Sequence, residues 1–330
     1  MKLLNKISAQ PKLGGKLQNI GERLTDRPNA ATRLAIDTWR NRWNLLMILP
    51  CLIYLALFSY KPMYGIIVAF KELKAGRTYA ECDWVGLKYF EHFLVDHYFL
   101  RTLKNTLTIS TLSLVIGFPI PIIFALLINE IRSKKFKKMI QTISYMPFFI
   151  STVIICGLIV QFCLSNGLIN NIIVWFGGER SNLLAKPELF YPILLISDQW
   201  QGMGWSSIIY LSTLASIDQE QYEAARIDGA SRIQQMIYIT LPGLAGVVSI
   251  QLILRVGSLL SVGMEKILLL YNPATYEVAD VISTYTYRKG LRGGNFSYGA
   301  AVELFNTAVN LILLNIANKV AGAVGQATFF

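Results

Sequence analysis

Residues Glu220–Leu244 read EQYEAARIDGASRIQQMIYITLPGL, and an apolar segment long enough to cross a membrane lies on each side of them. The stretch contains three acidic residues and two arginines, and it is rich in good helix formers. Charged side chains are costly inside a bilayer. We therefore expect this stretch to form short helices outside the membrane, between two spans.

Four polar residues and one glycine predict where these helices begin and end. Asp218 and Ser231 suit the N-cap position, because their side-chain oxygens can accept a hydrogen bond from the first turn. Gln221 and Gln234 each follow three residues later, which is the spacing of a capping box. Gly229 can adopt a positive φ and is expected to end the first helix. The pattern predicts a compact helix–turn–helix at the membrane surface.

The first of these helices has the features of a docking site for another protein. Ala224 and Ala225 have small side chains that let a partner's backbone approach closely, while Glu223 and Asp228 present charge. The alternative is an amphipathic helix that lies on the membrane. That role favours Lys and Arg on the polar face, whereas this segment has mostly acids. The residues favour docking, and both interpretations remain open.

The composition is that of an integral membrane protein. Of 330 residues, 53% are hydrophobic and 15% are charged, against about 25% charged in soluble domains. Mean hydropathy is +0.44. The net charge of +11 does not indicate nucleic-acid binding, because the basic residues lie mostly beside the apolar blocks. The four cysteines show no CxxC spacing, and the two histidines, His92 and His97, lie in a polar loop, so no metal site is expected.

An all-α membrane protein with six spans is predicted from the apolar blocks, each about 20 residues or longer. Prolines at Pro50, Pro119 and Pro121 are expected inside the first two spans. An apolar piece at 169–177 is too short to span and is expected to be an interfacial helix. The expected regions are a basic tail at 1–43, spans at about 44–70, 106–128, 140–164, 191–217, 244–262 and 300–318 with Pro242 at the start of the fifth, a loop at 218–243 and a tail at 321–330.

The short loops predict the orientation in the membrane. The tail at 1–43 has nine Lys or Arg against three Asp or Glu, and the sequence RSKKFKK follows the second span. Cytoplasmic loops collect Lys and Arg, so both segments are placed inside. The loop 218–243 and both termini are then cytoplasmic as well. The tail shows no short apolar run near Met1 of the kind that a secretory signal has.

A family resemblance is found in the same loop. The pattern E-A-A, three residues, G, nine residues, I-x-L-P resembles the signature of permease subunits of binding-protein-dependent ABC importers. DGA at 228–230, WVGLKYF, NEIRSKKFKKMIQTISYMPFFIS and LLLYNPATYEVADVISTYTYRKGL resemble the carbohydrate branch, which takes up oligosaccharides and polysaccharide fragments. The similarity covers about residues 40–320. The residues that match the signature are Glu223, Ala224, Ala225, Gly229, Ile239, Leu241 and Pro242.

The resemblance implies a coupling helix that fits into a cleft of a cytoplasmic ATPase. It implies a homologous second permease in a heterodimer, a dimeric ATPase that uses ATP and Mg, an extracytoplasmic solute-binding protein, and the plasma membrane of a bacterium. The chain has no Gly-x-x-x-x-Gly-Lys-Ser/Thr loop, so it is expected to be a translocation subunit without its own enzymatic activity or cofactor. The ATPase-coupling residues would be Glu223, Ala224, Ala225, Asp228, Gly229, Leu241 and Pro242.

Polar and aromatic residues in the later spans are candidates for the substrate path, because polar groups inside a membrane usually face a cavity or a partner helix. Arg255 would suit an acidic sugar, since a guanidinium binds a carboxylate bidentately. Packing of the tryptophans, interhelical bonds from the asparagines and an Arg255–Glu265 pair are the alternatives. The candidates are Asp198, Trp200, Trp205, Arg255, Glu265, Tyr271, Asn272, Tyr285, Tyr287, Glu303, Asn306 and Asn310.

Two other function classes compete with the importer. An ion-gradient-driven secondary transporter often has two related halves and broken helices at matching positions. No convincing repeat relates residues 44–165 to 190–320, and no chain of intramembrane acids suggests a proton relay. A membrane enzyme would need a nucleophile–base pair or a metal set, and the span acids Asp198 and Glu303 supply neither.

Overall fold

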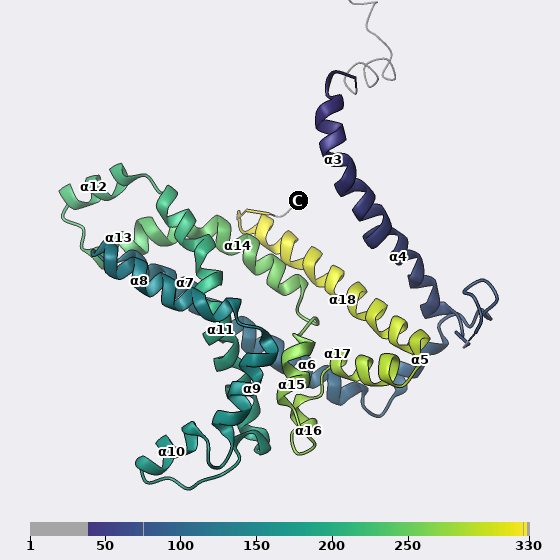
Figure 1. Ribbon diagram of the computed structural model, residues 1–330. Helices are drawn as coiled ribbons and strands as arrows, with labels where there is room; N and C mark the ends of the chain where they lie inside the picture. The colour runs from purple at the N-terminus through teal and green to yellow at the C-terminus, as the bar shows by residue number, and fades with distance from the viewer. Residues whose placement is uncertain (1–38, 75, 326, 329–330) are drawn as a thin grey trace, which may run out of the picture. The chain divides into compact units, whose positions relative to one another are not determined.

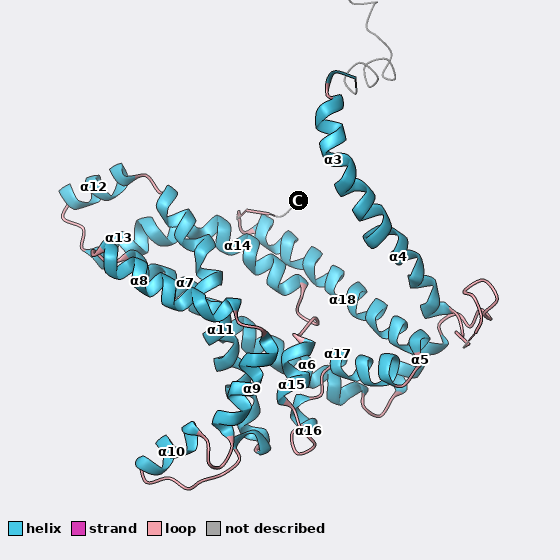
Figure 2. Ribbon diagram, in the orientation of Figure 1, coloured by secondary structure: helices cyan, strands magenta, loops and turns pink. Residues whose placement is uncertain are grey.

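The computed structural model describes residues 39–74, 76–325 and 327–328, so most of the expected tail at 1–43 and part of 321–330 lie outside it. The described residues form helices and loops without a strand, apart from an isolated bridge between Lys71 and Trp84 (Figure 2). The chain divides into two units, Met1–Gly65 and Ile66–Phe330. The expectation of a helical membrane protein is confirmed.

The first unit is dominated by one apolar helix. Helix α3, Arg42–Leu55, contains Pro50 and continues through a π-helical turn into α4, Lys61–Met63. A 3-10 segment, Tyr64–Phe70, then leads into the second unit. The helical segment continues through the YKPMYG sequence at 60–65, with Pro62 near the start of α4.

The second unit contains the remaining helices (Figure 1). π-Helical turns at Ser113–Gly117, Met236–Thr240 and Tyr287–Arg292 and 3-10 turns at Met146–Phe149 and Leu183–Ala185 join some of them. The helices are α5 Lys88–Val95, α6 Phe99–Leu112, α7 Pro119–Asn129, α8 Lys134–Tyr145, α9 Thr152–Cys163, α10 Leu168–Trp175, α11 Pro187–Ser216, α12 Gln219–Ile227, α13 Arg232–Gln235, α14 Leu241–Gly257, α15 Met264–Leu270, α16 Tyr276–Ala279, α17 Ile282–Thr286 and α18 Phe296–Ala323.

Five helical segments of the described residues are long and apolar enough to cross a membrane. The fourth expected span, 191–217, coincides with α11, a helix of 30 residues that is not in this set. Asp198, Gln199 and Gln201 interrupt its apolar sequence. The five segments are Arg42–Phe70, Phe99–Asn129, Thr152–Trp175, Arg232–Gly257 and Phe296–Ala323.

The third expected span, 140–164, has the wrong boundaries. Helix α8 ends at Tyr145, and α9 begins only at Thr152. Between them Pro147 opens a 3-10 turn, and Ile150 has an extended backbone. Proline has no N–H to donate and its ring crowds the carbonyl four residues earlier, so the α-helix ends inside an apolar run. The apolar piece at 169–177 forms the short helix α10, as expected, while its place at the interface stays a prediction.

Helices α14 and α18 lie side by side, and α11 packs against α7 and α8 (Figure 1). Helix α18 also contacts the turn Tyr287–Arg292, where Gly290 and Gly299 meet. A Cβ added to Gly290 would lie 2.8 Å from the Cα of Gly299, so only glycine permits this approach. The α12 end of the unit is far from the end that carries α10 and α16 (Figure 1).

A buried carboxylate fixes the end that carries α16. Asp280 is fully buried, and its carboxylate forms ion pairs with Arg288 at 2.6 Å and Arg101 at 3.2 Å. Thr284 donates a further bond to it at 2.9 Å. The hydrogen bond to Asp280 raises the pKa of Arg288 above its usual value. Since Arg101 belongs to α6 and Arg288 follows α17, the carboxylate ties the start of α6 to the segment before α18.

Candidate functional site

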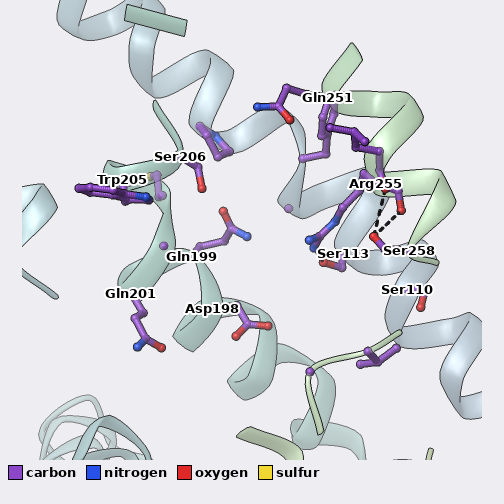
Figure 3. A pocket seen from close by; sticks show the side chains of 18 of the residues that line it. Ser110, Ser113, Asp198, Gln199, Gln201, Trp205, Ser206, Gln251, Arg255 and Ser258 are labelled. Atoms are coloured by element: carbon purple, nitrogen blue, oxygen red, sulfur yellow. Dashed lines mark hydrogen bonds between the residues drawn. The ribbon is translucent and has the colours of Figure 1, made fainter. Parts of the chain in front are cut away.

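A cavity of about 780 Å³ lies in the second unit, among α6, α11, α14, α15 and the turns beside them (Figure 3). One wall comes from α11, where cavity-lining residues recur every three or four positions: Asp198, Gln201, Trp205 and Ile209. Such residues lie on one face of a helix. The polar residues that make α11 less apolar than the five candidate spans therefore face the cavity.

The side chains of the two long walls are rich in hydrogen-bonding groups. Figure 3 shows Gln199 and Ser206 of α11 on one side, with Gln251, Arg255 and Ser258 on the other. The Oε1 atom of Gln199 is buried and has no hydrogen-bond partner. A buried polar atom without a partner is costly, so this oxygen suits a donor supplied by a ligand.

Three charged residues line the cavity, and two of them are cations. The Lys266 ammonium lies 2.7 Å from a carboxylate oxygen of Asp198. Arg255 donates a hydrogen bond to the hydroxyl of Ser113 and forms no ion pair with a carboxylate of the described residues. The cavity therefore has an excess of positive charge, and the Arg255 guanidinium retains donors for a ligand.

An aromatic group borders the same cavity. The rings of Phe148 and Trp205 stack with centroids 4.5 Å apart and an interplanar angle of 3°. Phe149 meets Trp205 edge-on at 5.6 Å. The break between α8 and α9 places both phenylalanines on the turn Met146–Phe149. Trp205 thus has a fixed orientation beside the polar groups, a combination of apolar face and hydrogen-bond donors that suits a sugar ring.

Three of the twelve substrate-path candidates line this cavity: Asp198, Trp205 and Arg255. The expected alternative for Arg255, an ion pair with Glu265, is not formed, since its partner is Ser113. The other candidates do not line the cavity; they are Trp200, Glu265, Tyr271, Asn272, Tyr285, Tyr287, Glu303, Asn306 and Asn310.

Asn306 and Asn310 of α18 hold the loop that follows α14. The Asn310 amide accepts a hydrogen bond from the Leu260 N–H at 3.0 Å and donates one to the Ser261 hydroxyl at 2.9 Å. The Asn306 amide donates to the Leu260 carbonyl at 3.3 Å. The alternative predicted for this pair is a hydrogen bond to another helix, whereas the structure shows that both amides bond to the loop after α14. Because Leu259 and Ser261 line the cavity, the two asparagines support its wall.

Two further candidates have partners at the α16 end of the unit. The Tyr285 hydroxyl donates to Asp96 at 2.6 Å, and the ring is almost completely buried. Asn272 donates to the Leu184 carbonyl at 2.7 Å. Both contacts join segments distant in sequence, so these side chains act in packing the described structure. No contact of this kind could be read from the sequence alone.

Sequence reasoning missed several residues of the cavity. Lys266, Gln201 and Gln251 line it, and so do Phe148 and Ser113. Two features of the sequence could have identified Lys266 and Gln201. Lys266 interrupts the apolar run MEKILLL, and Gln201 lies three residues after Asp198, on the same helical face. Nothing in the sequence indicates that the turn around Phe148 closes against Trp205.

The expected cytoplasmic loop begins with α12 and a tight turn. Asp218 caps α12 by accepting the Glu220 N–H at 3.0 Å. The expected reciprocal bond from Gln221 is absent from the hydrogen bonds of the described residues, so the capping box is wrong here. Gly229 has φ +79°, and the N–H groups of Gly229 and Ala230 bond to carbonyls of the last turn, as in a Schellman motif. The predicted glycine stop is confirmed.

The second half of the loop is continuous with a membrane span. Ser231 and Gln234 form the predicted capping box, with bonds of 2.7 and 3.4 Å. The helix then runs from Arg232 to Gly257 without ending, whereas two separate short helices were expected. Pro242 lies at the second position of α14, directly after the π-helical turn Met236–Thr240, so the missing N–H does not stop the helix.

The residues of the expected docking surface are accessible. Glu223, Ala224, Asp228 and Gly229 are exposed, and Ile227 between them is 87% exposed. Contacts at the base hold this segment: the Tyr222 hydroxyl lies 3.0 Å from that of Thr240, and Arg232 pairs with Glu130 at 3.9 Å. A projecting helix with small, charged and apolar groups in one patch can seat in a partner's cleft.

Comparison with known proteins gives a consistent result. Residues 117–322 match the family model described as "Binding-protein-dependent transport system inner membrane component". The chain is 44% identical to the polygalacturonan/rhamnogalacturonan transport system permease protein YteP of Bacillus subtilis (strain 168), over 89% of this chain and 92% of that protein. It is 39% identical to Protein LplB of the same organism, over 88% and 92% of the two chains.

Two solved structures resemble this fold closely. One is a bacterial ABC transporter involved in the import of the acidic polysaccharide alginate, with a TM-score of 0.82 and 43% identity over 88% of this chain and 99% of that chain. The other is a bacterial alginate ABC transporter in complex with an alginate pentasaccharide-bound periplasmic protein, with a TM-score of 0.82 and 42% identity over 90% and 99%. At this level of identity the likeness extends to sequence as well as fold.

Proposed function

The chain belongs to the family of binding-protein-dependent transport system inner membrane components, and from this premise we propose that it is the permease subunit of an ABC importer for an acidic oligosaccharide. A binding protein outside the cell delivers the sugar, and alternating access carries it into the cytoplasm. The observation that carries the proposal is a cavity with an excess of cations in a chain 44% identical to a polygalacturonan/rhamnogalacturonan permease.

The chemistry of the cavity supports an acidic sugar. A uronic acid unit has a carboxylate, several hydroxyls and an apolar ring face. Arg255 offers a guanidinium for the carboxylate, and the amides of Gln199 and Gln201 offer donors and acceptors for hydroxyls. Trp205 offers a ring for stacking. The names of two similar proteins, one for polygalacturonan and rhamnogalacturonan and one for alginate, refer to polymers of this charge class.

The partners follow from the same premise. We propose a heterodimer with a homologous permease and a dimeric cytoplasmic ATPase, which binds ATP and Mg, while this chain binds no cofactor. The projecting α12 segment is the coupling helix, and closure of the ATPase moves it. The residues proposed to transmit that motion are Glu223, Ala224, Ala225, Asp228, Gly229, Leu241 and Pro242.

The proposed setting is the plasma membrane of a bacterium, with both termini cytoplasmic. Helix α11 is then the fourth of six spans, because 30 helical residues extend about 45 Å and its polar face is turned to the cavity rather than to lipid. The transmembrane domain covers residues 44–320, between the basic tail at 1–43 and a short tail at 321–330. The ion-gradient alternative receives no support from the family or from the similar structures.

Co-purification tests the assembly. The chain is tagged at its C-terminus, expressed in its own host and extracted in mild detergent, and the proteins that accompany it are identified. We expect a second permease and an ATPase, with the ATPase lost in the variants Glu223→Lys and Gly229→Pro. Glu179→Lys is the matched control, because it makes the same charge reversal on an exposed loop far from α12. A chain that purifies alone under these conditions contradicts the importer.

Transport tests the substrate. The complete complex, reconstituted with its binding protein in proteoliposomes, is expected to take up short galacturonic acid oligomers when ATP is present. Arg255→Gln removes a guanidinium from the cavity, and a charge-assisted hydrogen bond contributes about 1.5–3 kcal/mol. The half-saturating concentration is therefore expected to rise roughly 10- to 100-fold. Equal uptake by wild type and variant would remove Arg255 from the substrate path.

A further inference from the structure

Resting on the function proposed above, we propose that Asp198 is an internal substitute for the carboxylate of the substrate. In the structure it pairs with Lys266. When an acidic sugar arrives, the carboxylate of the sugar takes this place on Lys266, and Asp198 is released to accept hydrogen bonds from sugar hydroxyls. Lys266 is then a second anion-binding residue beside Arg255, and the Asp198–Lys266 pair sets the preference of the permease for acidic over neutral sugars.

The burial of the two partners is unequal. The Lys266 side chain is 9% exposed, whereas that of Asp198 is 42% exposed, although their charged atoms are 2.7 Å apart. A buried ammonium without a counter-ion is strongly unfavourable, so Lys266 requires an anion whenever it is charged. The more exposed partner is the one that solvent can stabilise after it leaves. The unequal burial therefore favours replacement of the anion, Asp198, rather than of the cation, Lys266.

The two partners belong to separate elements that meet at the cavity. Asp198 is on the polar face of α11, and Lys266 is in the first turn of α15, beyond the loop that Asn306 and Asn310 hold. Both residues line the cavity, so a ligand in it reaches the pair directly.

The charge balance of the cavity favours the exchange. Its charged lining consists of Arg255, Lys266 and Asp198, which gives one positive charge in excess. A neutral sugar cannot replace Asp198 as the anion on Lys266, and it leaves the excess positive charge of the cavity unchanged. An acidic sugar neutralises it. The released Asp198 carboxylate lies one residue from Gln199, whose unpartnered Oε1 offers a second acceptor for hydroxyls.

Direct binding to the permease–ATPase complex in nanodiscs, without the binding protein, tests the inference by calorimetry. The probes are a galacturonic acid trimer and the same trimer with its carboxyl groups reduced to alcohols. We expect Asp198→Asn to lower the dissociation constant of the acidic trimer by about tenfold, which is ~1.4 kcal/mol, and to leave that of the neutral trimer unchanged. Lys266→Gln is expected to abolish the preference for the acidic trimer. Glu179→Gln, on an exposed loop, is the control.

A charge-swapped variant distinguishes a role of the Asp198–Lys266 pair in sugar recognition from a purely structural role. Asp198→Lys combined with Lys266→Asp restores an ion pair between α11 and α15 but buries the acid instead of the ammonium. If the pair is only a structural clamp, the swap restores both thermal stability and the preference, and the inference is overturned. We expect stability to be restored and the preference to stay lost. Should Asp198→Asn fail to assemble, the uncharged double variant Asp198→Asn with Lys266→Gln takes its place. Its preference for the acidic trimer is expected to be weaker than that of the wild type, with Arg255 alone binding the carboxylate, and an unchanged preference overturns the inference.

Failure of this inference is distinguishable from failure of the proposed function. If the wild-type complex neither binds nor transports any oligosaccharide, the proposed function is wrong. If the wild type transports the acidic oligomers and the variants keep its ratio of acidic to neutral binding, only the role of the Asp198–Lys266 pair is wrong.

Discussion

Gly229 shows how one residue fixes the geometry of the proposed coupling loop. Its φ of +79° lies in the left-handed region, and no other atom lies within 4 Å of where a Cβ would be. The requirement for glycine is therefore conformational and not a matter of space. An L-residue in this conformation costs about 1–2 kcal/mol. Asn tolerates the conformation better than Ala, because its side chain can bond to the local backbone.

Substitution of Gly229 is expected to weaken the contact with the ATPase. Gly229→Ala favours a different turn after α12, and about 1–2 kcal/mol corresponds to a roughly 5- to 30-fold loss of affinity. Titration of the permease pair with ATPase measures this, and Gly229→Asn is expected to retain more affinity than Gly229→Ala. Gly157→Ala is the control, since Gly157 lies inside helix α9 with open space around it. An equal effect of Ala and Asn would argue against a conformational cause.

At the scale of elements, hydrogen bonds from α18 hold the cavity wall in place. The loop after α14 has no regular structure of its own, and its backbone groups at Leu260 bond to the amides of Asn306 and Asn310. Both asparagines are buried within α18, where an unpaired amide would be unfavourable. The two asparagine side chains therefore supply the hydrogen-bond partners that the Leu260 backbone would otherwise lack.

Asn310→Ala is expected to destabilise the folded chain by about 1–3 kcal/mol, because the Leu260 N–H and the Ser261 hydroxyl lose their partner. Unfolding of the detergent-solubilised complex, followed by loss of helicity, measures the change. Asn315→Ala is the matched control on the same helix, since Asn315 is exposed and bonds only within α18. The assignment is contradicted if the two variants unfold alike.

The carboxylate of Asp280 stabilises the end of the second unit that carries α16. Asp280→Asn leaves the guanidinium groups of Arg101 and Arg288 without their anion, and breaking a buried pair costs about 3–5 kcal/mol. The melting temperature of the complex is expected to fall markedly. Asp83→Asn serves as the comparison, because Asp83 pairs with Lys74 at an exposed position, and it is expected to leave the melting temperature unchanged.

At the scale of the whole molecule, the topology depends on α11. If this helix crosses the membrane, residues before Pro187 and after Ser216 lie on opposite sides. Its amphipathic character, with a polar face toward the cavity, explains why it is less apolar than the other spans. Labelling of the loops on either side of α11 therefore measures the number of spans.

Thiol labelling checks the topology. In a chain carrying Cys51→Ser, which removes the exposed native cysteine, Glu179→Cys and Asp228→Cys are introduced one at a time. A membrane-impermeant reagent is expected to label the first in intact spheroplasts and the second only after permeabilisation. Labelling of both under the same condition would show that α11 does not cross. The three buried cysteines, Cys82, Cys156 and Cys163, are expected to react slowly without any substitution.

The sequence predicts the architecture well where a local signal exists. Long apolar runs identify the spans, and the spacing of Ser231, Gln234 and Gly229 identifies the caps. Other features depend on contacts between distant segments. Pro147 is hidden in an apolar run, so the break before α9 was missed. The pair between Asp198 and Lys266 joins two helices with no shared pattern, and nothing local points to it.

The unbroken helix from Arg232 to Gly257 has a consequence for communication between the two ends of the permease. It begins at the Ser231 cap in the proposed coupling loop and carries Arg255 into the cavity, roughly 36 Å away at 1.5 Å per residue. A rigid element transmits displacement in either direction. By thermodynamic linkage, whatever factor ATPase docking applies to sugar affinity, bound sugar must apply to ATPase affinity. In the proposed importer, the transported sugar is thus an allosteric effector of the ATPase that drives its uptake.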